Sequence, residues 1–321
     1  MAADIIAVAS VQGDGVVVPL IFHRGEELWS EPEIPLPGGK EGRRVLVTRN
    51  RELKSWTSHG SYDPAMRSLV ERVLPLGPLA AALDSVWHDR LDLFENDLGH
   101  PDPRLASSAW AVWANALQRV LAERNSVPEP EELWKWIADD SRPIENNLWW
   151  ILLGFHGTPA DHARITERLK DAWKDGGDEH LSAMISARLA GGGDDALVQV
   201  TAHYLLDRER TLAEIQEALA ALSVRGSEFP ATRTGIIKSY EQFRKERRPL
   251  AGLVAKDLAG WKNWDAWPDY LELLRSGEPI LPSTRTDILE YLKSCPVKKA
   301  RDGARALPMP RRVRGERFRA D

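Results

Sequence analysis

Helical periodicity, with no strand pattern, runs through most of this 321-residue chain from Tyr62 onward. In YDPAMRSLVERVL, apolar residues recur at the three- and four-residue spacing that places them on one face of a helix. Asp63 stands where an N-cap is expected, and Pro64 occupies the first helical position, where a missing N–H costs little. The segment predicts an amphipathic helix that must bury one face against a neighbour.

The same start and stop signals recur along the chain. Further helix starts are predicted at HPDP (100–103), TPAD (158–161) and TLAE (211–214), the last two as capping boxes. Glycines that follow the last apolar residue of a segment predict helix ends, namely Gly99, Gly157, Gly176, the GGG of 191–193 and Gly226. Together the signals predict on the order of a dozen helices joined mostly by short loops.

Short links make successive helices antiparallel neighbours. A long series of such pairs without strands favours an α-solenoid of HEAT-like antiparallel helix pairs over a closed bundle, although the repeat is degenerate in sequence. We therefore expect a mainly α fold.

The first 55 residues follow a different pattern. DIIAVAS, GVVVPLIF and RRVLVTR are β-branched runs separated by glycine- and proline-rich turns, which predicts three short strands that must pack against the helices. The predicted organisation is a small β element at 1–55, a HEAT-like helical repeat region at 56–307 and a basic tail at 308–321.

Composition narrows the class of protein. With 43% hydrophobic and 28% charged residues, the chain has an ordinary globular composition, and no apolar run approaches the about 20 residues that span a bilayer. The N-terminus lacks a basic segment before an apolar run and is not a secretory signal as written. We expect a cytoplasmic protein, or an exported one if the true start lies upstream.

Charge is distributed unevenly. Residues 298–321 hold nine Lys or Arg and three Asp or Glu, so they carry +6, whereas the whole chain carries −5 and the remainder therefore −11. A tail of this kind binds nucleic acid or an anionic surface in some proteins, but a solvated, disordered terminus explains it equally well, and the acidic body would repel phosphates. Its last part contains Arg311, Arg312, Arg314, Arg317 and Arg319.

Three of the 13 tryptophans recur at every third residue in DLAGWKNWDAWPDYLELL, residues 257–274. Trp261 and Trp264 flank a helix junction at Gly260, where large aromatic side chains fix the distance between helices. The face of Trp267 continues through later leucines of the same helix, for which Asn263 or Asp265 is the expected N-cap. We predict that Trp261 and Trp267 are largely buried.

Three other tryptophans are the candidate binding residues. Trp134 lies about 100° from the predicted apolar face of EELWKWIADD, so we expect it to be exposed. Trp149 and Trp150 cannot point to the same side of a helix. Either neighbours on both sides bury them, or they contribute to an aromatic groove for a peptide or a glycan.

Motifs of catalysis and metal binding are missing from the sequence. The eight histidines show no HExxH spacing, Cys295 is alone, GxSxG is absent, and PGGKEGRR does not meet the phosphate-loop spacing. We therefore predict no catalytic residue, no metal site and no cofactor.

Several segments together resemble a known family. These are ADIIAVAS near the N-terminus, HPDPRLASSAW (100–110), ILLGFHGTPADH (151–162), VAKDLAGWKNW (254–264) and ILEYLKSCPVKKA (288–300). They resemble an uncharacterised family of planctomycete bacterial proteins in which an N-terminal β segment precedes degenerate HEAT-like helical repeats. The resemblance implies this architecture and, for typical members, export; it implies no activity.

These observations favour a non-enzymatic helical-repeat scaffold or protein-binding module, whose partner is another protein. The alternative is an enzyme or nucleic-acid-binding protein on a HEAT-like scaffold, such as a nucleobase-excising glycosylase with tryptophans and one aspartate in a cleft. That alternative needs a basic surface, and the acidic body argues against it.

Overall fold

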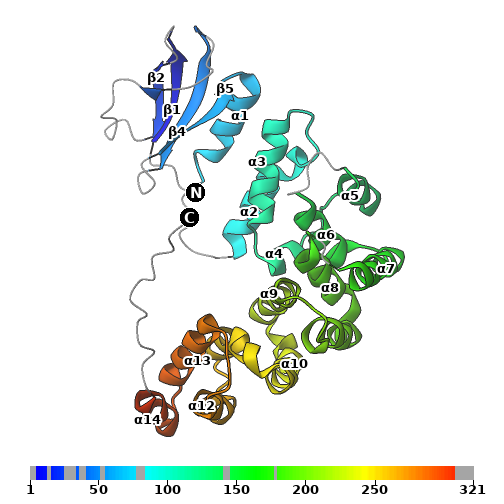
Figure 1. Cartoon of the computed structure of the whole chain (residues 1–321). Coiled ribbons are helices and arrows are strands. Elements are labelled where there is room, and N and C mark those ends of the chain that lie inside the picture. The colour runs from blue at the N-terminus through cyan, green and yellow to red at the C-terminus, as the bar shows by residue number, and fades with distance from the viewer. Residues whose placement is uncertain are drawn as a thin grey trace, which may run out of the picture. The chain divides into compact units, whose positions relative to one another are not determined.

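The computed structural model describes residues 5–12, 16–24, 34–35, 41–50, 55–76, 84–139, 145–176 and 179–307. Contacts divide the chain into two compact units, Met1–Val120 and Leu121–Asp321. Most of the described chain is helical, and a small antiparallel sheet lies at its N-terminal end (Figure 1). The prediction of a mainly α protein with a small N-terminal β element is confirmed at this level. None of the described helices is both long and apolar enough to cross a bilayer.

The sheet of the first unit has the strand order β3-β2-β1-β4-β5, and every described pairing is antiparallel. Its strands are β1 (Ile5–Val11), β2 (Val16–Arg24), β3 (Ile34–Pro35), β4 (Arg44–Asn50) and β5 (Ser55–Ser61). The three predicted strands correspond to β1, β2 and β4. Sequence reasoning missed β5, because SWTSHGS lacks a β-branched run, so the boundary predicted at residue 55 comes too early.

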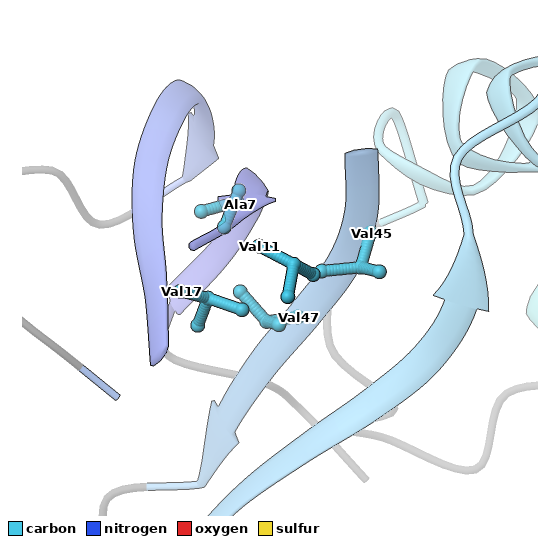
Figure 2. Packing of buried hydrophobic residues seen from close by; sticks show 6 residues of the cluster. Ala7, Val11, Val17, Val45 and Val47 are labelled. Atoms are coloured by element: carbon cyan, nitrogen blue, oxygen red, sulfur yellow. The ribbon is translucent and has the colours of Figure 1, made fainter. Parts of the chain in front are cut away.

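Alternation along the strands divides their apolar residues between two faces of the sheet. Figure 2 shows side chains of β1, β2 and β4 gathered into one cluster: Ala7, Val11, Val17, Val45 and Val47. Val8 and Leu46, which alternate to the opposite face, are also buried. Both faces of the central strands are therefore covered.

Helices α1 (Pro64–Val73), α2 (Asp84–Phe94) and α3 (Pro103–Ala114) belong to the first unit. Asp63 caps α1 as predicted, and the helix start predicted at HPDP is that of α3, which Asp102 caps; proline follows each cap. The Arg104 guanidinium lies 2.6 Å from both capping carboxylates and donates to the Ser61 carbonyl at 2.8 Å. Its hydrogen bonds lower the pKa of Asp102 to about 2. One arginine thus joins β5 to the first turns of two helices.

The second unit contains a consecutive series of helices. After α4 (Gln118–Ala122), which crosses the division between the units, they are α5 (Pro130–Ile137), α6 (Asn146–His156), α7 (Pro159–Asp175), α8 (Leu181–Val200), a π-helical turn η4 (Thr201–Leu206), α9 (Leu212–Glu228), α10 (Arg233–Glu246), a 3-10 segment η6 (Arg248–Val254), α11 (Ala255–Gly260), α12 (Trp267–Ser276), α13 (Pro282–Ser294) and α14 (Lys298–Ala306). The capping boxes predicted at Thr158 and Thr211 are both present.

Each helix of this unit contacts helices close to it in the chain. α6 packs against α5, α7 and α8, and α8 packs against α9. Further along, α10 contacts α9, α13 contacts α11 and α12, and α14 contacts α12 and α13. The core of the unit is therefore built from local contacts repeated along the chain.

One of the predicted helix ends is wrong, and another is confirmed as a break within one labelled element. At the GGG of 191–193, Gly193 has the non-helical angles φ 53° and ψ −143°, so α8 consists of two helical segments that meet at a kink. Gly226, which was predicted to end a helix, lies inside α9 instead. A side chain at this position would collide with the Trp261 ring, so close packing accounts for the glycine. Gly176, with φ 74°, does end α7 in a conformation that favours glycine.

The contact between α6 and α8 depends on small residues. A Cβ atom built on Gly154 would lie 2.4 Å from the Cα atom of Ala187, a distance at which two carbon atoms overlap. The backbones of the two helices therefore approach more closely than any larger residue at position 154 would permit.

We predict that Gly154→Ala lowers the free energy of unfolding by about 1–3 kcal/mol, because the added methyl group forces the two helices apart. The matched control is Gly260→Ala, since no atom lies within 4 Å of a Cβ built at that helix end. It should change stability by less than about 1 kcal/mol. Urea denaturation of both variants measures the difference, and equal effects would contradict the close crossing.

Candidate functional site

Trp134, which we expected to be exposed, is buried, with only 8% of its surface accessible. Its indole N–H donates to Asp161 Oδ1 at 2.7 Å, and the Arg164 guanidinium lies 3.8 Å from the ring centre. Its ring also meets Trp150 edge to face, with centroids 5.3 Å apart. The prediction was wrong because the first turns of α7 cover the side of α5 that intrahelical periodicity assigned to solvent.

Trp149 and Trp150 are each 2% exposed. Trp149 contacts Trp136 of α5, with ring centroids 4.7 Å apart, while Trp150 contacts Trp134. Burial of the pair favours the first of the two alternatives that the sequence left open, although one neighbouring helix, α5, meets both rings. The three candidate binding tryptophans therefore form a core between helices and offer no face to a ligand.

The tryptophans of the 257–274 segment are half-buried, so the prediction that Trp261 and Trp267 are largely buried holds only in part. Trp261 stacks on Tyr240, with centroids 5.7 Å apart and planes at 10°, and packs against Gly226. Trp264 contacts Tyr291 at 5.1 Å. Ala266 occupies the N-cap position of α12, which corrects the expectation of Asn263 or Asp265.

A polar cluster lies beside Trp261, at the meeting point of α9, α10 and α11. Asp257 of α11 accepts hydrogen bonds from Ser223 Oγ at 2.7 Å and from Tyr240 Oη at 2.8 Å. Burial raises the pKa of the Asp257 carboxyl, and these two hydrogen bonds offset part of the shift. Burial and the neighbouring carboxylate also raise the pKa of Tyr240 well above its ordinary value, so its hydroxyl stays protonated and donates.

The chemistry open to this cluster is limited by how its groups are used. A half-buried carboxyl with a raised pKa is the kind of group that serves as a general acid or base. In this structure, however, each Asp257 oxygen already accepts a hydrogen bond from a neighbouring helix. The arrangement joins three helices, and sequence reasoning missed it even though Asp257 falls three residues after Val254 and four before Trp261, on their side of the helix.

A surface recess lies where α14 crosses α12. It consists of two adjoining hollows with volumes of ≈ 410 Å³ and ≈ 590 Å³. Both hollows are lined by Leu271, Arg275 and Lys299, and the first also by Trp267. The Lys299 ammonium lies 5.9 Å from the centre of the Trp267 ring. The recess thus combines apolar side chains with cationic ones.

The basic stretch at residues 298–321 begins within helix α14. Lys298 and Lys299 belong to α14 and line the recess. The predicted tail, with Arg311, Arg312, Arg314, Arg317 and Arg319, lies outside the described residues. The end of α14 at Ala306 agrees with the boundary predicted between the helical region and the tail at 307/308.

Within the part of the chain that the structure describes, no three histidine, cysteine or acidic residues gather as metal ligands. Cys295 is buried. In comparisons with known proteins, no protein-family model matches the chain, and no curated protein or solved structure matches it. The resemblance to the planctomycete family therefore stays a prediction.

Because the pKa of Asp257 is raised, the free energy of unfolding should depend on pH. A carboxyl whose pKa is higher in the folded state binds its proton more tightly there than in the unfolded chain. Its contribution to stability therefore falls as pH rises from the unfolded pKa, about 4, through the folded value. We expect the stability of wild type relative to Asp257→Asn to fall as pH rises across this window and then to level off.

Urea denaturation between about pH 4 and about pH 7 measures this difference. The matched control is Asp194→Asn, since Asp194 is an exposed carboxylate of the same unit. Parallel pH profiles of wild type and Asp257→Asn would show that the cluster is not buried as described.

Proposed function

We propose that this protein is a non-enzymatic helical-repeat scaffold that binds another protein. Its second unit is the scaffold, with HEAT-like antiparallel helix pairs stacked in chain order. The pattern of contacts supports this architecture, because each helix packs against helices one or two places away in the chain. The burial of α6 between its neighbours supports it as well, because an inner helix of a stack is covered on more than one side.

The observation that carries the proposal is the use of the polar side chains. Groups that could perform chemistry hold helical segments together. Asp257 joins three helices. Arg210 donates to the His203 carbonyl of the π-helical turn at 3.0 Å while it binds the Glu214 carboxylate of α9 at 3.0 Å. The exposed recess at α12 and α14, in contrast, has cations at its rim. A binding role uses this surface and needs no convergent catalytic set.

A second candidate function, an enzyme on the same scaffold, is favoured by one observation. Asp257 has a raised pKa and lies one helical turn from Trp261, an aspartate and an aromatic ring side by side. This reading requires Asp257 to act on a substrate, whereas the scaffold reading gives it only a structural role.

Binding to a purified partner distinguishes the two functions. The full chain, immobilised, is exposed to an extract of its native organism, and each enriched protein is then produced alone and titrated against the chain by calorimetry. We expect one protein to bind directly, with the same affinity for wild type and for Asp257→Asn. Enrichment of nucleic acid without a protein partner, or loss of binding in a folded Asp257→Asn variant, would contradict the proposal.

A further inference from the structure

We propose that the recess between α12 and α14 is a docking site for an acidic, amphipathic segment of the partner protein, in which carboxylates flank an apolar side chain. The inference rests on the proposed function and specifies where the partner binds and what chemistry it brings. The two helices lie side by side near the C-terminal end of the described chain (Figure 1).

The floor of the recess is apolar. A Cβ atom on Gly303 would lie 2.6 Å from Leu271 Cδ2, so α14 crosses α12 in direct contact with this leucine. Leu271 is itself buried, whereas Trp267 beside it is half-buried. A shallow hollow over packed apolar side chains accepts an apolar anchor from a partner, as grooves that bind amphipathic helices do.

The rim of the recess is cationic. Arg275, Lys298 and Lys299 are exposed, and none of them forms an ion pair with another described residue. Two acidic residues, Glu272 and Asp302, also line the recess. The Asp302 carboxylate lies 3.8 Å from the Arg305 guanidinium, so Glu272 is the acidic residue that opposes the three rim cations. Three cations around an apolar floor complement a segment whose apolar residue is flanked by carboxylates.

Other occupants fit less well. A nucleic acid would use the cations but gain nothing from Leu271, because its phosphates are the groups that bind exposed lysine and arginine. The chain's own residues 308–321 carry five arginines and two acidic residues, so the rim would repel them. An acidic surface of a second copy is a further possible occupant, which self-association would reveal.

The test uses a fluorescein-labelled peptide of about 15 residues, in which glutamates flank leucine and tryptophan at helical spacing. Its binding to the full chain is followed by fluorescence anisotropy. A glutamine version removes the charge, a polyglutamate peptide removes the apolar anchors, and a single-stranded oligonucleotide supplies phosphates alone. Arg275→Glu/Lys299→Glu reverses the rim charge. Arg168→Glu/Lys238→Glu makes the same change in net charge at exposed positions of α7 and α10.

We expect the recess variant to bind the peptide about tenfold more weakly, a difference of about 1.4 kcal/mol, because its reversed rim repels the glutamates. The control variant should bind within about twofold of wild type, because its substitutions lie outside the recess. The glutamine and polyglutamate peptides should also bind weakly. Equal affinity of both double variants would overturn the proposal. So would an oligonucleotide that competes as well as the peptide, or self-association of the chain that the recess variant abolishes. Circular dichroism establishes that both variants are folded.

This experiment separates failure of the inference from failure of the proposed function. If the purified partner binds the recess variant as tightly as wild type, the protein is a scaffold whose docking site lies elsewhere. If no protein partner binds the chain at all, the proposed function itself fails.

Discussion

The close crossing of α6 and α8 is the contact on which the second unit depends. Gly154 lets the two backbones meet at Ala187, and this approach places α6 where α5 and α7 can also cover it. Trp149 and Trp150 of α6 are then buried, and both rings contact tryptophans of α5. Because aromatic side chains contribute much of the apolar area buried in a core, a helix covered on several sides stabilises all of its neighbours together.

Polar side chains also fix several helical segments at once, further along the chain. The Asp257 carboxylate draws α9, α10 and α11 together, and Arg210 connects the π-helical turn after α8 to the start of α9 through His203 and Glu214. Buried polar groups that are fully hydrogen-bonded fix one arrangement of helices, since any other leaves them unsatisfied. These polar groups of the interior are thus occupied by structural contacts.

How much of this was predictable depends on whether the signal was local. The caps at Asp63, Asp102, Thr158 and Thr211 came directly from the sequence, because a cap is set by residues within one turn. The burial of Trp134 and the position of Gly226 inside a helix depend on side chains from other helices, which periodicity does not contain. Of the candidate site, the sequence detected the basic charge at Lys298 and Lys299 but not the recess, because its floor forms only when α14 crosses α12.

Native-state hydrogen exchange over residues 121–307 measures whether close packing around α6 organises this unit. Amides that open only when the whole unit unfolds exchange most slowly. We expect the slowest exchange in α6 and in the part of α8 that crosses it. The fastest exchange among the helices is expected in α14, which contributes few large apolar side chains. Exchange in α6 as fast as in α14 would contradict this organisation, because the helix that its neighbours cover would then open independently of them.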